Sequence, residues 1–297
     1  KLERYYKGQH DILDRIKPPT NKNTRIVVNH ANYIVDVSIG YLLGNPVEYK
    51  VSDGFDIEEI KKQYKMQTIS DLDHEIAKDL SIYGIQYELV YNVDNDIRSK
   101  DIDVRNAVCI YDDTVEHNKM FGVIYRKGDK KDKFEDVVVY DSNFKYQCND
   151  DKGNIILGES EPHQFKQVPL IEYRNNSEYM GDFEQVISLM DAYNILQSDR
   201  MNDKEQLVEA ILVGYGMTLE PNQMEELLTN RTAFGLPLDS KLEYLIKSLD
   251  EGQIDILRKT IESDIHKIAK VPNMSDENFV GNASGVAIRY KLLGFEQ

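Results

Sequence analysis

A polar segment near the C-terminal end constrains the fold most strongly, because it separates two stretches of helical pattern. Pro272 ends the first stretch, a run of polar and small residues follows, and a new helix is expected from Ser284 and Gly285. A polar loop held between two helices is usually functional rather than a simple connection. It contains no set of catalytic residues, so we expect it to act by its position and its contacts.

Two helices and a compact insert are expected ahead of this loop. Asp182 is placed to cap a helix that runs to about Val208. The returning helix, Gly252–Lys270, is amphipathic, with apolar residues at Ile254, Leu257, Ile261, Ile265 and Ile268. Between the helices we expect strands at Ala210–Leu219, Thr232–Leu238 and Lys241–Ile246, and a short helix at Pro221–Asn230.

The first of these helices changes character along its length. Its second half, Gln197–Gln206, is polar nearly all round. Its first half carries an apolar stripe at Phe183, Val186, Ile187, Met190 and Tyr193. A helix that is polar on every side is expected to bridge regions through solvent or to lie in a polar contact between subunits. The second half should therefore be poorly stable on its own.

The sequence before this long helix predicts one α+β unit. Helical patterns cover Lys1–Ile16, Asn23–Leu43 and Asp56–Leu80, and the third is expected to break near Thr68. The apolar period then changes to two, with turn residues in the gaps. The expected strands are Ile85–Asn92, Ala107–Asp112, Met120–Arg126, Phe134–Asp141, Asn143–Cys148, Asn154–Glu159 and Val168–Arg174. The predicted architecture is an antiparallel meander beside helices.

The charge balance restricts the kinds of partner. The chain has 297 residues, of which 41% are hydrophobic, so it can bury a core, and its length suggests about two domains. It carries 52 acidic and 36 basic residues, a net charge of −16. Because duplex affinity depends mostly on basic residues, this charge argues against a tight sequence-specific DNA binder. A wall along which DNA passes without adhering is compatible with it.

Cysteine usage and hydropathy indicate the compartment. Cys109 and Cys148 show neither disulfide nor metal spacing, which favours a reducing environment. No segment approaches the roughly 18 apolar residues that span a bilayer, and no signal-peptide pattern is present. We expect a soluble protein of cytoplasmic origin. The start at Lys1 and the end inside an expected helix predict that the sequence is part of a longer chain.

Signatures of nucleotide and zinc enzymes are missing from the sequence. It lacks the G-x-x-x-x-G-K-[ST] motif, and Gly281–Gly285 is not followed by a lysine. The six histidines are scattered, and His266 lies beside an apolar helix face, which favours a packing role over metal ligation. We therefore expect no catalytic residue, no metal and no cofactor.

Four aspartates provide the main alternative. Asp94, Asp96, Asp101 and Asp103 resemble metal carboxylates, but they lack the glycine and distal glutamate of an EF-hand. A solvated acidic loop is the preferred interpretation. In the alternative, a metal-dependent nuclease or other nucleic-acid enzyme, these carboxylates would converge around one or two ions. The sequence leaves that alternative open.

Three separated segments carry a family resemblance. The first is R-I-V-V-N-H-A-N-Y-I-V-D-V-S-I-G-Y-L-L-G-N-P-V at Arg25–Val47. The second is N-N-S-E-Y-M-G-D-F-E-Q-V-I-S-L-M-D-A-Y-N-I-L-Q-S-D at Asn175–Asp199, and the third is D-E-N-F-V-G-N-A-S-G-V-A-I-R-Y-K-L at Asp276–Leu292. In this order they resemble the siphophage-type portal proteins of tailed double-stranded DNA bacteriophages. The corresponding family motifs are G-D-F-E…L-I-D-A-Y-N…S-D and F-x-G-N-x-S-G-x-A-L-K-Y-K.

The resemblance implies a ring, typically of twelve subunits, around a DNA channel at one capsid vertex. In this chain it implies an α+β wing at Lys1–Tyr179, stem helices at Met180–Val208 and Gly252–Lys270, a small α/β clip at Glu209–Glu251, a tunnel loop at Val271–Ala283 and the start of a long wing helix at Ser284–Gln297. The rest of that helix and the crown would lie beyond this sequence.

The resemblance further implies a non-enzymatic virion protein, made in the host bacterial cytoplasm, that serves DNA packaging, retention and ejection. The implied partners are further copies of the chain, double-stranded DNA bound without sequence preference, a terminase, head-completion or adaptor proteins, scaffold protein and major capsid protein. No membrane partner is implied. A capsid-associated adaptor that encloses no DNA path is a second alternative.

The expected DNA contacts lie in the tunnel loop and just before it. Within the loop they are weak and blind to sequence, through Asn273, Met274, Ser275, Asp276, Glu277, Asn278 and Asn282. Lys267 and Lys270, about one helical turn before the loop, are the nearest basic candidates for phosphate contact. Exposed lysines that only solvate the helix end are an equally good interpretation.

Overall fold

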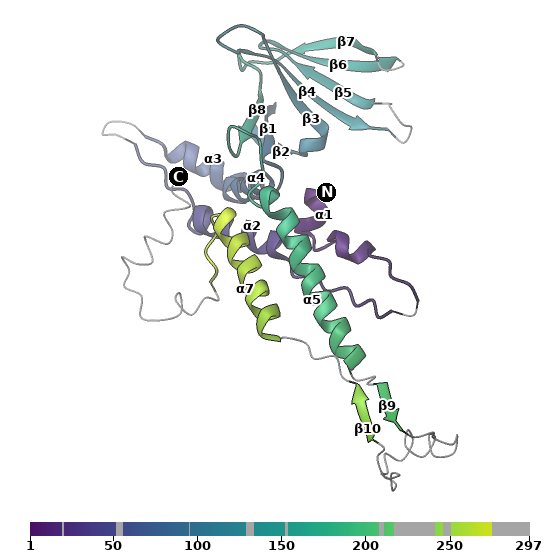
Figure 1. The fold of residues 1–297 in the computed structure, drawn as a ribbon. Coiled ribbons are helices and arrows are strands. Elements are labelled where there is room, and N and C mark those ends of the chain that lie inside the picture. The colour runs from purple at the N-terminus through teal and green to yellow at the C-terminus, as the bar shows by residue number, and fades with distance from the viewer. Residues whose placement is uncertain are drawn as a thin grey trace. The chain divides into compact units, whose positions relative to one another are not determined.

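The chain forms two compact units, each built from separate stretches of sequence. Figure 1 shows its helices and strands along the chain. The computed structural model describes residues 1–19, 21–51, 56–94, 96–128, 134–151, 154–207, 211–216, 241–245 and 251–274. The first unit contains Lys1–Gln9, Asn29–Ser188 and Ile265–Gln297, and the second contains His10–Val28 and Leu189–Asp264. Among the described residues, no helix is both long and apolar enough to cross a membrane.

The helices of the first unit are α1 (Leu2–Tyr6), α2 (His30–Leu43), α3 (Glu58–Met66) and α4 (Ile69–Tyr83). The predicted break near Thr68 is confirmed, because α3 ends before this residue and its φ is 49°. The single helix predicted over Lys1–Ile16 is wrong. Gly8, with φ of 75°, ends α1 in a Schellman motif, in which Gln9 N donates to Arg4 O.

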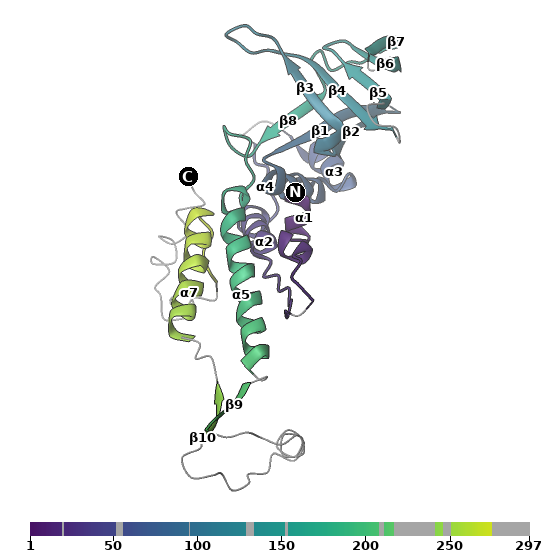
Figure 2. The same ribbon diagram turned by 45° about the vertical axis from the view of Figure 1, so that its right-hand side comes forward.

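Two antiparallel sheets complete the first unit, as the period-two pattern predicts (Figure 2). One has the order β2-β1-β8, from β1 (Ile85–Val93), β2 (Asp96–Ile102) and β8 (Leu170–Arg174). The other is a meander of β3 (Ala107–Tyr111), β4 (Lys119–Lys127), β5 (Phe134–Tyr140), β6 (Phe144–Asp151) and β7 (Asn154–Pro162). All seven predicted strands are present, and β2 is an additional strand that the prediction missed.

The sheet cores form where the inward-facing residues of these strands meet. Buried residues from both sheets form one cluster, at Tyr87, Ala107, Cys109, Tyr140, Val168 and Leu170. Gly122 of β4 permits this close packing, since a Cβ there would lie 2.6 Å from Leu170 Cβ. A second cluster lies within the meander, at Val123, Val137, Val139 and Cys148. Both cysteines are free and buried, so they act as core residues.

The second unit contains most of two long helices, α5 (Ile187–Leu207) and α7 (Glu251–Ile268). They run antiparallel, because Lys204 near the end of α5 pairs with Glu251 at the start of α7, at 3.3 Å. Strands β9 (Ile211–Tyr215) and β10 (Lys241–Leu245) pair antiparallel, as both views show (Figures 1 and 2). The helix predicted at Pro221–Asn230 and the strand predicted at Thr232–Leu238 lie outside the described residues.

The cap predicted at Asp182 is wrong. The carboxylate of Asp182 accepts hydrogen bonds from Ser81 Oγ at 2.6 Å and from Asn175 Nδ2 at 2.8 Å. A 3₁₀ turn at Glu184–Val186 then leads into α5. The side chain is therefore used to hold neighbouring segments of the first unit together, and it does not satisfy the first N–H groups of the helix.

An extended segment, residues 24–28, lies along the polar side of α5, and we call it the strap. Thr24 N donates to Asn202 Oδ1 at 2.8 Å, and Ile26 N donates to Ser198 Oγ at 2.9 Å. Val28 N donates to Asn194 Oδ1 at 2.8 Å. The spacing matches, because two extended residues advance about 6.6 Å and four helical residues about 6 Å.

The strap corrects two predictions. The helix predicted over Asn23–Leu43 begins only at His30, because the N–H groups before it bind α5 side chains instead of helix carbonyls. The polar half of α5, Gln197–Gln206, was expected to bridge through solvent or to lie in a polar contact between subunits, but two of its residues, Ser198 and Asn202, are buried beneath the strap, as is Asn194 before them. Their side-chain oxygens accept hydrogen bonds from backbone N–H groups of the strap, which would otherwise be buried without partners.

We expect Asn194→Ala to lower the free energy of unfolding by about 1–3 kcal/mol, because it leaves the Val28 N–H without its acceptor. The Asn194 amide also bonds His10 Nδ1, at 3.0 Å. Denaturant unfolding of the monomeric chain measures the change. Ile195→Ala, at an exposed position of the same helix, is the control. Equal stability of the two variants would contradict the role of the strap.

Asp79 of α4 should make stability depend on pH. Burial raises the pKa of Asp79 to about 6 from 3.8, with Lys78 opposing the shift and Glu75 adding to it. The folded protein therefore binds the proton more tightly, and its free energy of unfolding falls as pH rises from about 4 to about 6. Gln86 Nε2 donates to Asp79 Oδ2 at 2.9 Å, a bond that an asparagine oxygen can also accept.

We expect Asp79→Asn to stabilise the fold by about 1–3 kcal/mol near pH 7 and to have little effect near pH 4. Denaturant unfolding at several pH values measures this difference. Asp96→Asn, at an exposed position of β2, is the control and should show no such pH dependence. A gain for Asp79→Asn that is the same at both pH values would refute the assignment.

Candidate functional site

The predicted loop begins at a well-defined anchor in the first unit. Asn273 and Met274 are among the described residues, and both lie directly after α7 and Pro272. The other predicted contacts, Ser275, Asp276, Glu277, Asn278 and Asn282, lie outside the described residues. The structure therefore describes the start of the predicted loop and the helix end before it. We call residues 266–274 the base of the loop.

A Schellman motif ends α7 and directs the chain into the loop. Lys270 adopts the left-handed conformation, with φ of 59°. Val271 N donates to His266 O at 3.1 Å, and Lys270 N reaches Lys267 O at 3.4 Å. Val271 is buried, which is the usual hydrophobic contact after such a motif. The direction in which the loop leaves the helix is set by these contacts.

His266 fixes the base of the loop from inside the unit. Its ring is buried and makes edge-to-face contacts with His30, at 5.8 Å between ring centroids, and with Tyr33, at 5.4 Å. Its Nδ1 lies 3.2 Å from Val271 O, so the ring donates to the carbonyl just beyond α7. The histidine thus packs and positions the chain, in agreement with the interpretation of its place on the helix.

Tyr33 of α2 binds the loop directly. Its hydroxyl donates to Pro272 O at 3.0 Å and accepts from Met274 N at 2.8 Å. One side chain therefore satisfies a backbone donor and a backbone acceptor on either side of Asn273. Pro272 has no N–H and cannot donate to a helical carbonyl. The two bonds to Tyr33 therefore hold the backbone here in place of helical hydrogen bonds.

Sequence reasoning missed both His30 and Tyr33. They lie in the His30–Tyr33 stretch that was predicted to be the middle of a helix, and nothing in its periodicity marks a contact with the loop. The structure shows that this stretch is the first turn of α2. The bonds that Tyr33 makes span 239 and 241 residues of sequence, so no local pattern could have indicated them.

Lys267 and Lys270 are both exposed at the end of α7. Neither has an acidic partner at ion-pair distance in the described part of the chain. Positive side chains near a helix C-terminus also interact favourably with its dipole. Their position is compatible with phosphate contact and equally with the solvation of the helix end.

The aspartates of the metal-site alternative do not share one site. Asp96 and Asp101 lie on β2, where five residues separate them by about 16 Å and direct them to opposite faces. Asp103 caps a 3₁₀ turn and binds Arg105 Nε at 2.8 Å. The preferred interpretation as a solvated loop is also wrong, because this stretch is mostly a strand. Over the described ranges, no three His, Cys, Asp or Glu side chains are arranged to hold a metal ion.

Comparison with known proteins defines the class to which this chain belongs. The family model described as "Phage portal protein, SPP1 Gp6-like" matches residues 1–297. The chain therefore belongs to the phage portal protein family, and within it to the type named after phage SPP1. The resemblance predicted from the three sequence segments is confirmed.

Two portal proteins show how distant the similarity is. The portal protein of Bacillus phage SPP1 is 22% identical over 336 residues, which include 98% of this chain. The portal protein of Clostridium phage phiCD119 is 22% identical over 333 residues, which include 96% of this chain. The chain spans 64% of the length of the SPP1 protein and 71% of the length of the phiCD119 protein.

We expect Tyr33→Phe to loosen the start of the loop, because Met274 N loses its acceptor and Pro272 O its donor. Amide hydrogen exchange at Met274 should become about five- to tenfold faster, the effect of losing about 1 kcal/mol. Hydrogen exchange measured by mass spectrometry, on peptides that contain Met274, tests this. Tyr91→Phe, the same change on β1, is the control and should leave this exchange unchanged. Unchanged exchange in Tyr33→Phe would contradict the role of Tyr33 in holding the start of the loop.

Proposed function

We propose that copies of this chain assemble into a ring that forms the DNA channel at one vertex of a phage capsid. Family membership supports this role, and one observation on the chain itself carries it. Part of the apolar stripe of α7 is uncovered in a single chain: Leu257 and Ile268 are exposed, Ile254 and Ile261 are half-buried, and Ile265 is buried. A surface of this kind is expected to be buried between subunits.

The stripe on α7 was predicted from five isoleucine and leucine positions. Of these, Ile265 is fully buried, whereas Leu257 is 50% exposed and Ile268 is 44% exposed. Helices with an apolar stripe normally bury it, and covering these two half-exposed side chains would gain about 1 kcal/mol for each. Identical copies arranged in a closed ring would cover this surface in every subunit.

The loop that follows α7 would then contact the DNA inside the ring. In this proposal Val271–Ala283 is the tunnel loop, and its polar side chains make contacts that do not depend on sequence. Lys267 and Lys270 are exposed beside its base and can reach phosphates. The net charge of −16 repels the duplex elsewhere, so DNA slides without adhering. The Tyr33 anchor would hold the loop against the force of the moving DNA.

The remaining parts take the roles that the family suggests. Residues Lys1–Tyr179 would be the wing, Met180–Val208 and Gly252–Lys270 the stem, and Glu209–Glu251 the clip. The clip would dock a terminase during packaging and head-completion or adaptor proteins afterwards. Scaffold and major capsid proteins would surround the wing, and assembly would take place in the host bacterial cytoplasm. No step in this role requires catalysis by the chain.

Two variants of the protein at its full natural length test the proposal. Leu257→Asp should abolish ring formation, because it places a charge in the surface between subunits. Deletion of Asn273–Asn278 should leave rings intact and reduce DNA packaging severely. Native mass spectrometry and electron microscopy report assembly, and a packaging assay reports DNA uptake.

Ser263→Asp is the matched control, at an exposed position on another face of α7. It should assemble normally, and all variants should keep the circular dichroism of the parent. Rings from Leu257→Asp would show that α7 does not join the subunits. Normal packaging by the deletion variant would show that the loop does not act on DNA.

A further inference from the structure

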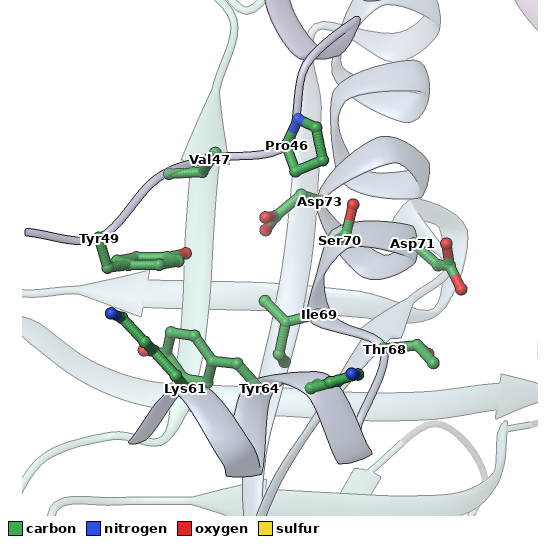
Figure 3. Close-up of a pocket in the computed structure, with 11 residues that line it drawn as sticks. Pro46, Val47, Tyr49, Lys61, Tyr64, Thr68, Ile69, Ser70, Asp71 and Asp73 are labelled. Atoms are coloured by element: carbon green, nitrogen blue, oxygen red, sulfur yellow. The ribbon is translucent and has the colours of Figure 1, made fainter. Parts of the chain in front are cut away.

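An apolar pocket of about 370 Å³ opens between the segment after α2 and helices α3 and α4 (Figure 3). Tyr49 and Tyr64 meet edge to face in it, with ring centroids 5.1 Å apart. Val47, Pro46 and Ile69 complete its apolar lining. None of the nine residues of α3 is buried in the single chain, so this helix has an open side.

The charged residues at the rim of the pocket favour acidic groups of an occupant on the side formed by α3. Lys61 of α3 and Asp71 and Asp73 of α4 line the pocket (Figure 3), and Lys65 of α3 lines it as well. Lys61 pairs with Glu58 at 3.2 Å, but both side chains are well exposed, so this pair is weak and exchangeable. Burial and Glu88 raise the pKa of Asp73, so the α4 side disfavours a further acid. Acidic groups of an occupant should therefore face α3.

A turn elsewhere in the first unit has the complementary chemistry. Val115 is fully exposed at the tip of the connection between β3 and β4, with Asp113 and Glu116 beside it. We call residues 112–118 the Val115 turn. A single exposed valine is common, but here it stands between acids on a turn that is held firmly in shape.

Hydrogen bonds and stacking hold the Val115 turn. Asp112 N donates to Asn118 O at 2.9 Å, and Asp112 Oδ1 accepts from Thr114 Oγ1 at 2.7 Å and from Asn118 N at 3.0 Å. His117 stacks on Tyr111 with ring planes 4° apart. A turn that is already ordered loses little conformational entropy when it binds.

We propose that the Val115 turn of one copy inserts into the α3–α4 pocket of the neighbouring copy. Val115 would pack against Tyr49 and Tyr64, and its flanking acids would face Lys61 and Lys65. A second copy is the fitting occupant, because the chain is acidic overall and carries both surfaces. Since the turn and the pocket are different surfaces, the contact is head-to-tail, as closed rings require. This inference rests on the ring proposed above.

Charge reversal in the protein at its full natural length tests the contact. Lys61→Glu with Lys65→Glu should raise the protein concentration needed for half-assembly by about tenfold or more, because like charges then face each other. Asp113→Lys with Glu116→Lys should do the same. All four changes together should restore assembly to within about threefold of the parent. Sedimentation velocity measures the assembled fraction.

Lys62→Glu is the matched control, because it changes the same charge on the same helix outside the pocket, and it should leave assembly unchanged. A cysteine pair gives a second test: Val47→Cys with Val115→Cys should form covalent ladders of subunits under oxidation, and neither single variant should. The native cysteines are buried and do not interfere. Absence of ladders, or charge reversal without effect or without rescue, would overturn the contact. A parent protein that forms no ring would instead refute the proposed function.

Discussion

The hydrogen bonds between the strap and α5 are the constraint on which the second unit depends. A polar helix face and an extended strand are each unstable in a protein interior, because their donors and acceptors lack partners. Placed together, residues 24–28 and the row Asn194, Ser198 and Asn202 satisfy each other at 2.8–2.9 Å. The arrangement also accounts for the late start of α2 at His30. One set of bonds therefore determines where two elements begin and which face of α5 is covered.

The same principle operates at the base of the loop. Once α7 ends, its chain has no helical ladder, and Tyr33 and His266 supply the missing partners to Pro272, Met274 and Val271. The loop thus starts from a fixed point, set by the bonds of Tyr33 to Pro272 and Met274. In the ring proposed above, such an anchor would let the loop bear load at its base. Part of the apolar stripe of α7, at Leu257 and Ile268, is likewise uncovered in a single chain.

The success of the sequence-based prediction depended on how local each signal was. Strands β1 and β3 to β8 were predicted because their alternation is local and strong. Strand β2 was missed because its sequence, Asp96–Ile102, is dominated by charged residues and is exposed along much of its length, so it shows no alternation. Asp182 has the right residue type for a cap, but Ser81 and Asn175 compete for its carboxylate. Such competition involves residues far apart in sequence and cannot be read from a local pattern.

The sequence by itself determined the α+β class, the meander, the two long helices and the membership of the portal family, because periodicity and family motifs are written in consecutive residues. It also determined the acidic balance of the chain, a net charge of −16. Only the tertiary structure decided that Asn23–Val28 is extended, that Ser198 and Asn202 on one side of the polar half of α5 are buried, and that Tyr33 holds the start of the loop. The physical reason is that backbone groups are satisfied by whichever partners the fold brings near, and those partners lie up to 241 residues away.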